Sequence, residues 1–435
     1  MRWLPTLFAA ESIPSAMITF VALLMFLQLG IGWEWSTLLC ALLSLPWVLK
    51  SFVREKVRRM GRFSIVLRFI EACIFASLVA LAFTFSTSTR WRVGLIFLAL
   101  LVLCVFCAWH ELAARMYYER MLRSHEQRIY NTPKMFFSQA SVIVTYGAMI
   151  MIVGALEVFY HNRRNAIALS WSTAIYLLAG VSLLLFIYHI FVLRPPVVGN
   201  RHLAESFRSA VRAEVDVIDR ILHKEHWLAA IVCLFLFMLP QSLLFYTRVL
   251  FLYAPHTDGG LGCSLQWIGL AQGTVGVIAF SAALGLGYWI DRQQRYRHFD
   301  KVAAALMGLS PLVYYAMTLW PPANLGILCL ATFIAQAAFG FGLNACIPFV
   351  RYISGERYRS TINYLYIPLV SMVMLPATAA SGWMVYRMGF HLFFALDALL
   401  LLPSILAAYY GTHLAASSQQ STPSSPNHAT NENEK

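Results

Sequence analysis

The stretch AIALSWSTAIYLLAGVSLLLFIYHIFVL, residues 166–193, contains no Asp, Glu, Lys or Arg. At a helical rise of about 1.5 Å per residue, it is long enough to cross the roughly 30 Å hydrocarbon core of a bilayer. A lipid-embedded segment must satisfy its backbone polar groups internally, which a single segment can do only as a helix. These residues therefore predict a transmembrane helix.

Similar apolar runs recur along the whole chain. Its 435 residues are 59% hydrophobic and only 12% charged, whereas soluble domains are about one-quarter charged. We therefore expect an all-α membrane protein with twelve transmembrane helices in two six-helix bundles. The predicted spans are residues 4–29, 35–49, 63–85, 93–114, 135–156, 166–193, 227–252, 265–290, 302–320, 325–350, 364–384 and 390–410.

The net charge of +13 is distributed in a way that indicates membrane topology. Lys and Arg cluster in loops that all fall on one side of the predicted membrane: residues 50–62, 115–134, 194–224 and 292–301. Short cytoplasmic loops carry this excess of positive charge. We therefore expect both chain termini to be cytoplasmic, with a lipid bilayer rather than nucleic acid as the partner of these basic residues.

The span pattern divides the chain into four parts. Residues 1–193 form the first six-helix bundle, residues 194–226 a central cytoplasmic loop, and residues 227–411 the second bundle. Apolar residues at helical spacing within 203–222 predict an amphipathic helix in the central loop. Residues 412–435 are polar and predict a disordered tail. The eight cysteines are scattered, which indicates neither a disulfide framework nor a metal site.

A short motif follows the eighth predicted span. Gly287, Asp291 and Arg292 stand in the order Gly-x-x-x-Asp-Arg. In this position the motif resembles a cytoplasmic loop of major facilitator transporters, whose halves also contain six spans each. The resemblance implies close helix packing at Gly287 and a charge pair, formed by Asp291 with a nearby Arg, that latches an inner gate.

Further segments resemble the muropeptide permease (AmpG-like) branch of that superfamily. They are FAAESIP at 8–14, LPWVLK at 45–50, HELAARMYY at 110–118, QGTVGVI at 272–278 and GFHLFF at 389–394. The resemblance implies a transporter in a bacterial inner membrane. The departures fall on charges: the branch's Arg-Leu-Pro-Glu is MLPQ at 238–241, and Arg115 replaces an acid.

Ionisable side chains within spans are costly and are therefore functional candidates. Glu11, three residues before Pro14, is predicted to bind a proton or a substrate amine, or alternatively to reach the membrane surface. Arg68 and Glu71 are three residues apart and are predicted to form an intramembrane ion pair, as a structural lock or as part of a gate. His110 and Glu111 point about 100° apart on a helix, so their partners must come from other spans.

Glu111 is the strongest candidate for carrying protons, although water from the cytoplasm could also solvate it. Neutral polar residues in the spans could bond sugar hydroxyls or amides, or could hold helices together. They are Gln139, Gln241, Gln272, Gln336, Asn344 and Asn363. Of these, we assign Gln241, Gln336 and Asn344 with Glu11, His110 and Glu111 to a substrate and proton pathway. Asp397 is expected to make a structural contact.

Together these features predict a monomeric secondary transporter that imports an amphipathic glycan or glycopeptide, such as a cell-wall muropeptide, by proton symport with alternating access. The same fold with another cargo (a sugar, a peptide or an exported drug) is the main alternative. A transport-dead sensor and an intramembrane transferase are weaker ones. We expect no enzymatic activity and no cofactor, because the sequence has no second catalytic cluster, metal-ligand spacing or nucleotide loop.

Overall fold

The computed structural model describes residues 2–50, 57, 62–87, 91–194, 212, 219, 223, 226–292, 299–346 and 359–420, and in these residues the secondary structure is entirely helical. The first half comprises α1 Trp3–Ala16, η1 Met17–Val21, α2 Ala22–Gln28, α3 Trp33–Leu42, α5 Phe63–Ser86, α6 Arg92–Met121, α7 Ser124–Val142, η2 Ile143–Met149, α8 Ile150–Phe159 and α9 Ala166–Val192. The second comprises α11 Trp227–Tyr253, η3 His256–Asp258, α12 Leu265–Ile268, η4 Gly269–Gly276, α13 Val277–Arg292, α14 Phe299–Met307, α15 Leu309–Leu319, α16 Leu325–Gly342, η5 Leu343–Ala345, α18 Arg359–Leu399 and α19 Leu401–Gln420.

Ten helical stretches in the described residues are long and apolar enough to cross a membrane. Two features separate this number from the twelve predicted spans. The helix at 33–50 is interrupted by a turn at residues 43 and 44, since Pro46 lacks an N–H and its ring clashes with the carbonyl four residues earlier. The last two predicted spans fall within one stretch, Pro368–Tyr410, but its helical course is broken between them at Gly389, which has a φ of 76°. The count of twelve therefore remains a prediction.

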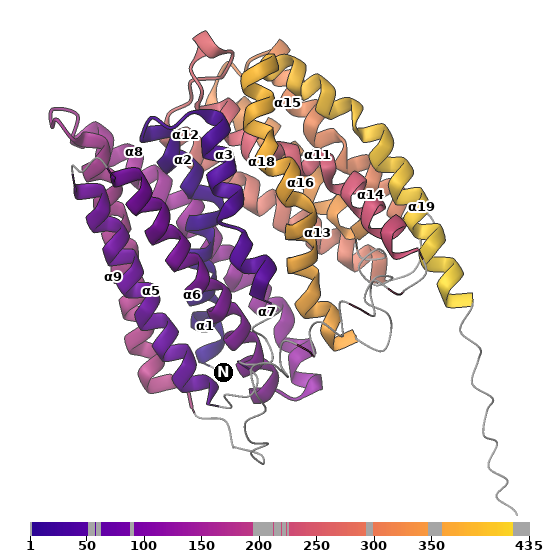
Figure 1. Ribbon diagram of the computed structural model, residues 1–435, viewed down its shortest axis with the longest axis horizontal. Coiled ribbons are helices and arrows are strands. Elements are labelled where there is room, and N and C mark those ends of the chain that lie inside the picture. Colours follow the sequence, from indigo (N-terminus) through magenta and orange to yellow (C-terminus); the bar gives the residue numbers. More distant parts are fainter. Residues whose placement is uncertain are drawn as a thin grey trace, which may run out of the picture.

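The helices form two groups that lie side by side (Figure 1). We call the end of the molecule at which α1 begins the near face, and the end at which α2 turns into α3 the far face. Figure 1 shows the two groups meeting at the far face and diverging toward the near face, where the N-terminus lies. In the second group, α11 packs against α18 and α19, and α13 packs against α16.

The far-face halves of the two groups are joined by direct contacts. The amide N–H of Gly382 in α18 donates to Oγ1 of Thr37 in α3 over 3.2 Å. The hydroxyl of Tyr246 in α11 donates to the carbonyl of Cys40 in α3 over 3.4 Å. The rings of Trp33 and Phe390 lie 5.3 Å apart. These contacts hold the two groups together on the far side of the molecule.

Three helices widen into π-helical segments where the two groups meet. These segments are η1, η2 and η4; η2 packs against both of the others. A side chain at Gly273 of η4 would collide with the backbone of Tyr146 and Gly147 in η2, so only glycine permits this approach. π-helical turns occur frequently at functional sites.

The predicted domain boundaries stay predictions. Helix α19 continues to Gln420, into the segment predicted as the polar tail. The rest of the predicted tail, residues 421–435, lies outside the described residues, as does nearly all of the amphipathic helix predicted at 203–222.

Candidate functional site

The near-face half of the first group contains a buried ion pair. Oε1 of Glu111 in α6 lies 2.6 Å from Nζ of Lys50, and the two side chains are 14% and 5% exposed. Oε2 accepts a hydrogen bond from the indole Nε1 of Trp47 over 3.1 Å. The turn that interrupts the second predicted span places Trp47 and Lys50 beside α6. Both oxygens of Glu111 are thus held, and its partners come from another span, as the sequence predicted.

A second carboxyl and a second lysine extend this charged group. Oε2 of Glu11 in α1 is buried and has no hydrogen-bond partner among the described residues. The Glu11 carboxyl interacts electrostatically with Glu111, Lys134, Lys50 and Arg115. Lys134 of α7 places its ammonium 4.6 Å from the ring centroid of Phe8 and 5.2 Å from that of Tyr118. We call Glu11, Lys50, Glu111 and Lys134 the charged cluster.

Glu71 does not pair with Arg68 as predicted. Its Oε1 lies 3.1 Å from Nε2 of His110 in α6 and 2.7 Å from Nδ1 of His189 in α9. The Nε of Arg68 donates instead to the carbonyl of Ser64, one turn earlier in the same helix. The prediction of this pair was wrong because the spacing within one helix does not show which side chains of other helices reach the carboxylate, and here two imidazoles from α6 and α9 bond it.

The second group contributes amides and aromatic hydroxyls. Nε2 of Gln336 in α16 donates to Oε1 of Gln272 over 3.3 Å, and Nε2 of Gln272 donates to the hydroxyl of Tyr314 over 2.8 Å. Nε2 of Gln241 in α11 donates to the carbonyl of Met307, while its Oε1 is buried without a partner among the described residues. Gln336 and Gln241 therefore both lie inside the second group.

Arg248 is a buried cation that the sequence analysis missed. It lies in α11 with 4% exposure, and its Nε has no hydrogen-bond partner in the described part of the chain. Within the same part, no carboxylate forms an ion pair with it. Its guanidinium carbon lies 5.3 Å from the ring centroid of Phe245, and its charge interacts with the hydroxyls of Tyr146, Tyr246 and Tyr314. A buried arginine without a carboxylate partner is suited to an anion.

Asn344 makes helix-to-helix contacts near the end of α16. Its Nδ2 donates to the carbonyl of Phe341 over 3.0 Å and to that of Leu284 in α13 over 3.3 Å. A side chain added at Gly287 would collide with Asn344. The close approach expected at Gly287 is therefore present, and the Asn344 amide is used in packing α13 against α16.

The proposed latch at the end of α13 is only partly described. Asp291 is half-buried near the last turn of α13, and the side chains of Arg292 and Asn363 lie outside the described part of the structure. The pairing of Asp291 with a nearby arginine stays a prediction. Asp397, expected to make a structural contact, is fully buried, and neither of its oxygens has a hydrogen-bond partner among the described residues.

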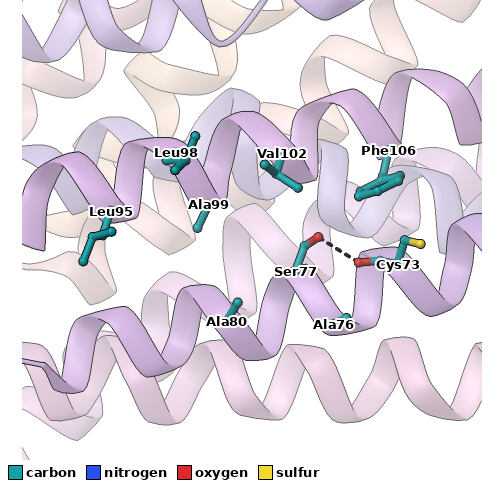
Figure 2. A pocket seen from close by; sticks show the side chains of 9 residues that line it. All are labelled: Cys73, Ala76, Ser77, Ala80, Leu95, Leu98, Ala99, Val102 and Phe106. Atoms are coloured by element: carbon teal, nitrogen blue, oxygen red, sulfur yellow. Dashed lines mark hydrogen bonds between the residues drawn. The ribbon is translucent and has the colours of Figure 1, made fainter.

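An apolar surface groove of about 400 Å³ lies between α5 and α6 (Figure 2). Its lining includes exposed Leu98 and Val102, and the hydroxyl of Ser77 is already donated to the carbonyl of Cys73. The groove offers no free polar group to a glycan. It is therefore not the solute site. In the described residues no group of three His, Cys, Asp or Glu side chains could hold a metal ion.

No family model and no curated protein matches the chain. Several solved structures are similar to it in fold. A POT family transporter in complex with 5-aminolevulinic acid aligns over 95% of this chain and 96% of its own, at a TM-score of 0.68 and 9% identity. The nucleoside transporter NupG aligns over 95% and 99%, at 0.66 and 13%. The inward-open xylose transporter XylE from E. coli aligns over 95% and 95%, at 0.61 and 11%.

These likenesses establish the fold and nothing narrower. The chain has the all-helical membrane fold of these transporters, which confirms the predicted all-α membrane fold class. The AmpG-like branch is not tested by them. A weak signal for the missed residues was present in the sequence: Arg248 is a lone cation inside the seventh apolar run, and Lys134 and His189 each stand at the margin of one.

Proposed function

We propose that this chain is a secondary transporter that imports an amphipathic, anionic glycan or glycopeptide, such as a cell-wall muropeptide, by proton symport. The observation that carries the proposal is the pairing of two buried sites in one transporter fold. The charged cluster lies in the first group of helices, and Arg248 with its aromatic and amide neighbours lies in the second.

The charged cluster supports a polar, multiply charged solute. Burying these groups in a membrane costs several kcal/mol unless partners satisfy them. Glu111 and Lys50 satisfy one another, but Oε2 of Glu11 is without a partner in the described part of the chain. A solute that carries an amine as well as a carboxylate, as a peptide does, would complement both signs of charge.

The second group supports the anionic and glycan parts. The Arg248 guanidinium can hold a carboxylate with two parallel hydrogen bonds. The amide and hydroxyl chain of Gln272, Gln336 and Tyr314 is suited to sugar hydroxyls, which need both donors and acceptors. Phe245, next to the Arg248 guanidinium, adds apolar surface for an amphipathic cargo.

The contacts at the far face support alternating access. Sealed far-face halves require the charged cluster to exchange with solvent from the near face in this conformation. The basic loops predicted from the sequence favour a cytoplasmic near face. We therefore take the structure as a state that releases solute inward, in a monomer of a bacterial inner membrane.

Uptake by proteoliposomes tests the proposal. A radiolabelled peptidoglycan disaccharide-tripeptide is offered at the far face with an inward pH gradient of about one unit. We expect accumulation that approaches tenfold for each coupled proton and that collapses with a protonophore. Absence of both accumulation and exchange would refute the proposal. Chemical conversion of the glycan without uptake would favour an enzyme, and binding without uptake a sensor.

One observation supports a different cargo in the same fold. Met238 and Gln241 stand where the resembled branch has Arg and Glu, and the Gln241 amide is bonded to the backbone of Met307. Arg248 alone would then select a smaller carboxylate. Competition of the labelled glycopeptide by short peptides and by sugar acids separates the two cargoes.

A further inference from the structure

A second buried group in the first half of the molecule consists of Glu71, His110 and His189. His110 and His189 are fully buried and Glu71 is 4% exposed. Glu71 comes from α5, His110 from α6 and His189 from α9. Helix α1 contributes Thr6, whose Oγ1 lies 2.9 Å from Nε2 of His189. His110 directly precedes Glu111 of the charged cluster along α6. We call Glu71, His110 and His189 the histidine group.

The protons around His189 can be assigned from its hydrogen-bond network. The Thr6 hydroxyl donates its one hydrogen to the carbonyl of Trp3 over 3.1 Å. Thr6 Oγ1 must then accept from His189, so Nε2 of His189 carries a proton. The 2.7 Å contact between Nδ1 of His189 and Oε1 of Glu71 requires a second proton, which this pair shares. The pair is therefore neutral overall, as an imidazolium with a carboxylate.

His110 is the member of the group that can take up another proton. Its Nε2 lies 3.1 Å from the same Glu71 oxygen, which as an acceptor requires a proton on Nε2. Its Nδ1 is buried with no hydrogen-bond partner in the described part of the chain, and so is Oε2 of Glu71. A proton from water added to Nδ1 turns the imidazole into imidazolium, and the group's charge rises from zero to plus one. Release reverses this step.

We propose that the histidine group is the proton-binding site of the transporter, separate from the charged cluster that binds solute. The inference rests on the proposed function. It adds which residues bind the proton and how proton binding acts on α1. A charged His110 attracts Glu71 and weakens its bond to His189, the residue that holds Thr6 of α1. Proton binding therefore loosens α1, the helix that carries Glu11 of the charged cluster.

Other charges near the group are directed elsewhere. The four helices packed around it also carry Arg68, which bonds the Ser64 carbonyl, Glu111, which bonds Lys50, and Arg115 and Glu11, which interact with one another. Among the described residues, the hydrogen-bond partners of Glu71 are His110 and His189. The charge of this group is thus set mainly by its own three members.

Histidine nitrogen NMR tests the site without any solute. The full chain, labelled with ¹⁵N-histidine, is placed in lipid nanodiscs and titrated over roughly pH 5 to 8, the range in which histidine changes charge. The His110→Gln and His189→Gln variants assign the two residues by loss of their signals. We expect the His110 signals to move from one neutral tautomer to imidazolium, and both nitrogens of His189 to stay protonated. A His110 that keeps one protonation state throughout would overturn the inference.

A transport assay with the His110→Gln variant is the second test. A glutamine at position 110 keeps an amide donor near Glu71 but cannot titrate. With the disaccharide-tripeptide as probe, His110→Gln proteoliposomes should exchange internal for external label but lose gradient-driven accumulation. The control His391→Gln, at an exposed histidine of α18, should accumulate like the wild type. Wild-type-like accumulation by His110→Gln would overturn the inference, whereas a wild type that neither accumulates nor exchanges refutes only the proposed function.

Discussion

Lys50 and Glu111 depend on one another inside the membrane. Removing one partner leaves the other charge buried, which is more costly than losing the attraction. We expect Lys50→Met or Glu111→Gln alone to lower the free energy of unfolding by about 1–3 kcal/mol, because Glu111 retains some exposure. The double variant should recover most of that loss. Thermal unfolding in detergent measures the cycle; additive losses would show that the pair is not coupled.

Replacing Arg248 should raise the stability of the protein rather than lower it. Because its charge is buried without a carboxylate among the described residues, Arg248→Gln should raise stability by about 1–2 kcal/mol in the absence of solute. The same change should weaken binding of the disaccharide-tripeptide by about tenfold or more, since a charged hydrogen bond is worth about 1.5–3 kcal/mol. The control is Arg387→Gln at an exposed position. Unchanged affinity in Arg248→Gln would remove Arg248 from the solute site.

Cys263 lies between α11 and α12 at the far face, where burial raises its pKa to about 11. Only the thiolate reacts with maleimides, so the neutral thiol that dominates below that pKa reacts slowly. Labelling of Cys263 by an impermeant maleimide should therefore quicken about tenfold per pH unit between about pH 7 and 10. Exposed Thr257→Cys in a Cys263→Ser background should level off near pH 9. Equal pH profiles would contradict the raised pKa.

At the scale of the elements, the contact between η2 and η4 can be tested by adding one carbon. Gly273→Ala places a Cβ against the backbone of Tyr146 and Gly147, which cannot rotate away. Overpacking of this kind costs about 1–3 kcal/mol. Gly180→Ala in α9, where a Cβ meets open space, should be neutral or stabilising by up to about 1 kcal/mol. Equal melting temperatures for the two variants would show that η2 and η4 are not tightly packed.

The apolar runs predicted the helices well because helix formation in lipid depends on hydrophobicity and length, both of which are local. Gly389 interrupts α18 between the last two predicted spans, 364–384 and 390–410. The break in the second span was not predicted, because it arises at Pro46, a single residue whose effect depends on its neighbours. The π-helical segments were missed for the same reason: their extra residue per turn is stabilised by contacts between helices.

The candidate site was less predictable than the helices. Sequence spacing placed Arg68 beside Glu71, but the partners of Glu71 come from α6 and α9, which lie far away along the chain. Periodicity cannot specify which face of one span meets which face of another. The sequence did predict that His110 and Glu111 need partners from other spans, since that followed from helix geometry alone.

At the scale of the whole molecule, we expect the far-face contacts between the two groups to form in one part of the transport cycle and to open in another. The Thr37 hydroxyl donates to the carbonyl of Ala379 across the two groups, so the double variant Thr37→Cys/Ala379→Cys should form a disulfide under oxidation. The cross-link should stop uptake by trapping the sealed state, and reduction should restore it. Each single variant serves as a control. Full uptake with complete cross-linking would show that the far face need not open.

The glycine contact between η2 and η4 has a mechanical consequence. Helices that pack through side chains interlock as ridges in grooves, and one can turn on the other only after the ridges disengage. At Gly147 and Gly273 the backbones touch directly, with no side chain between them. That contact is close enough to exclude lipid and water, yet no side chains interlock across it. One half of the molecule can therefore rotate against the other at this point without side chains first having to separate.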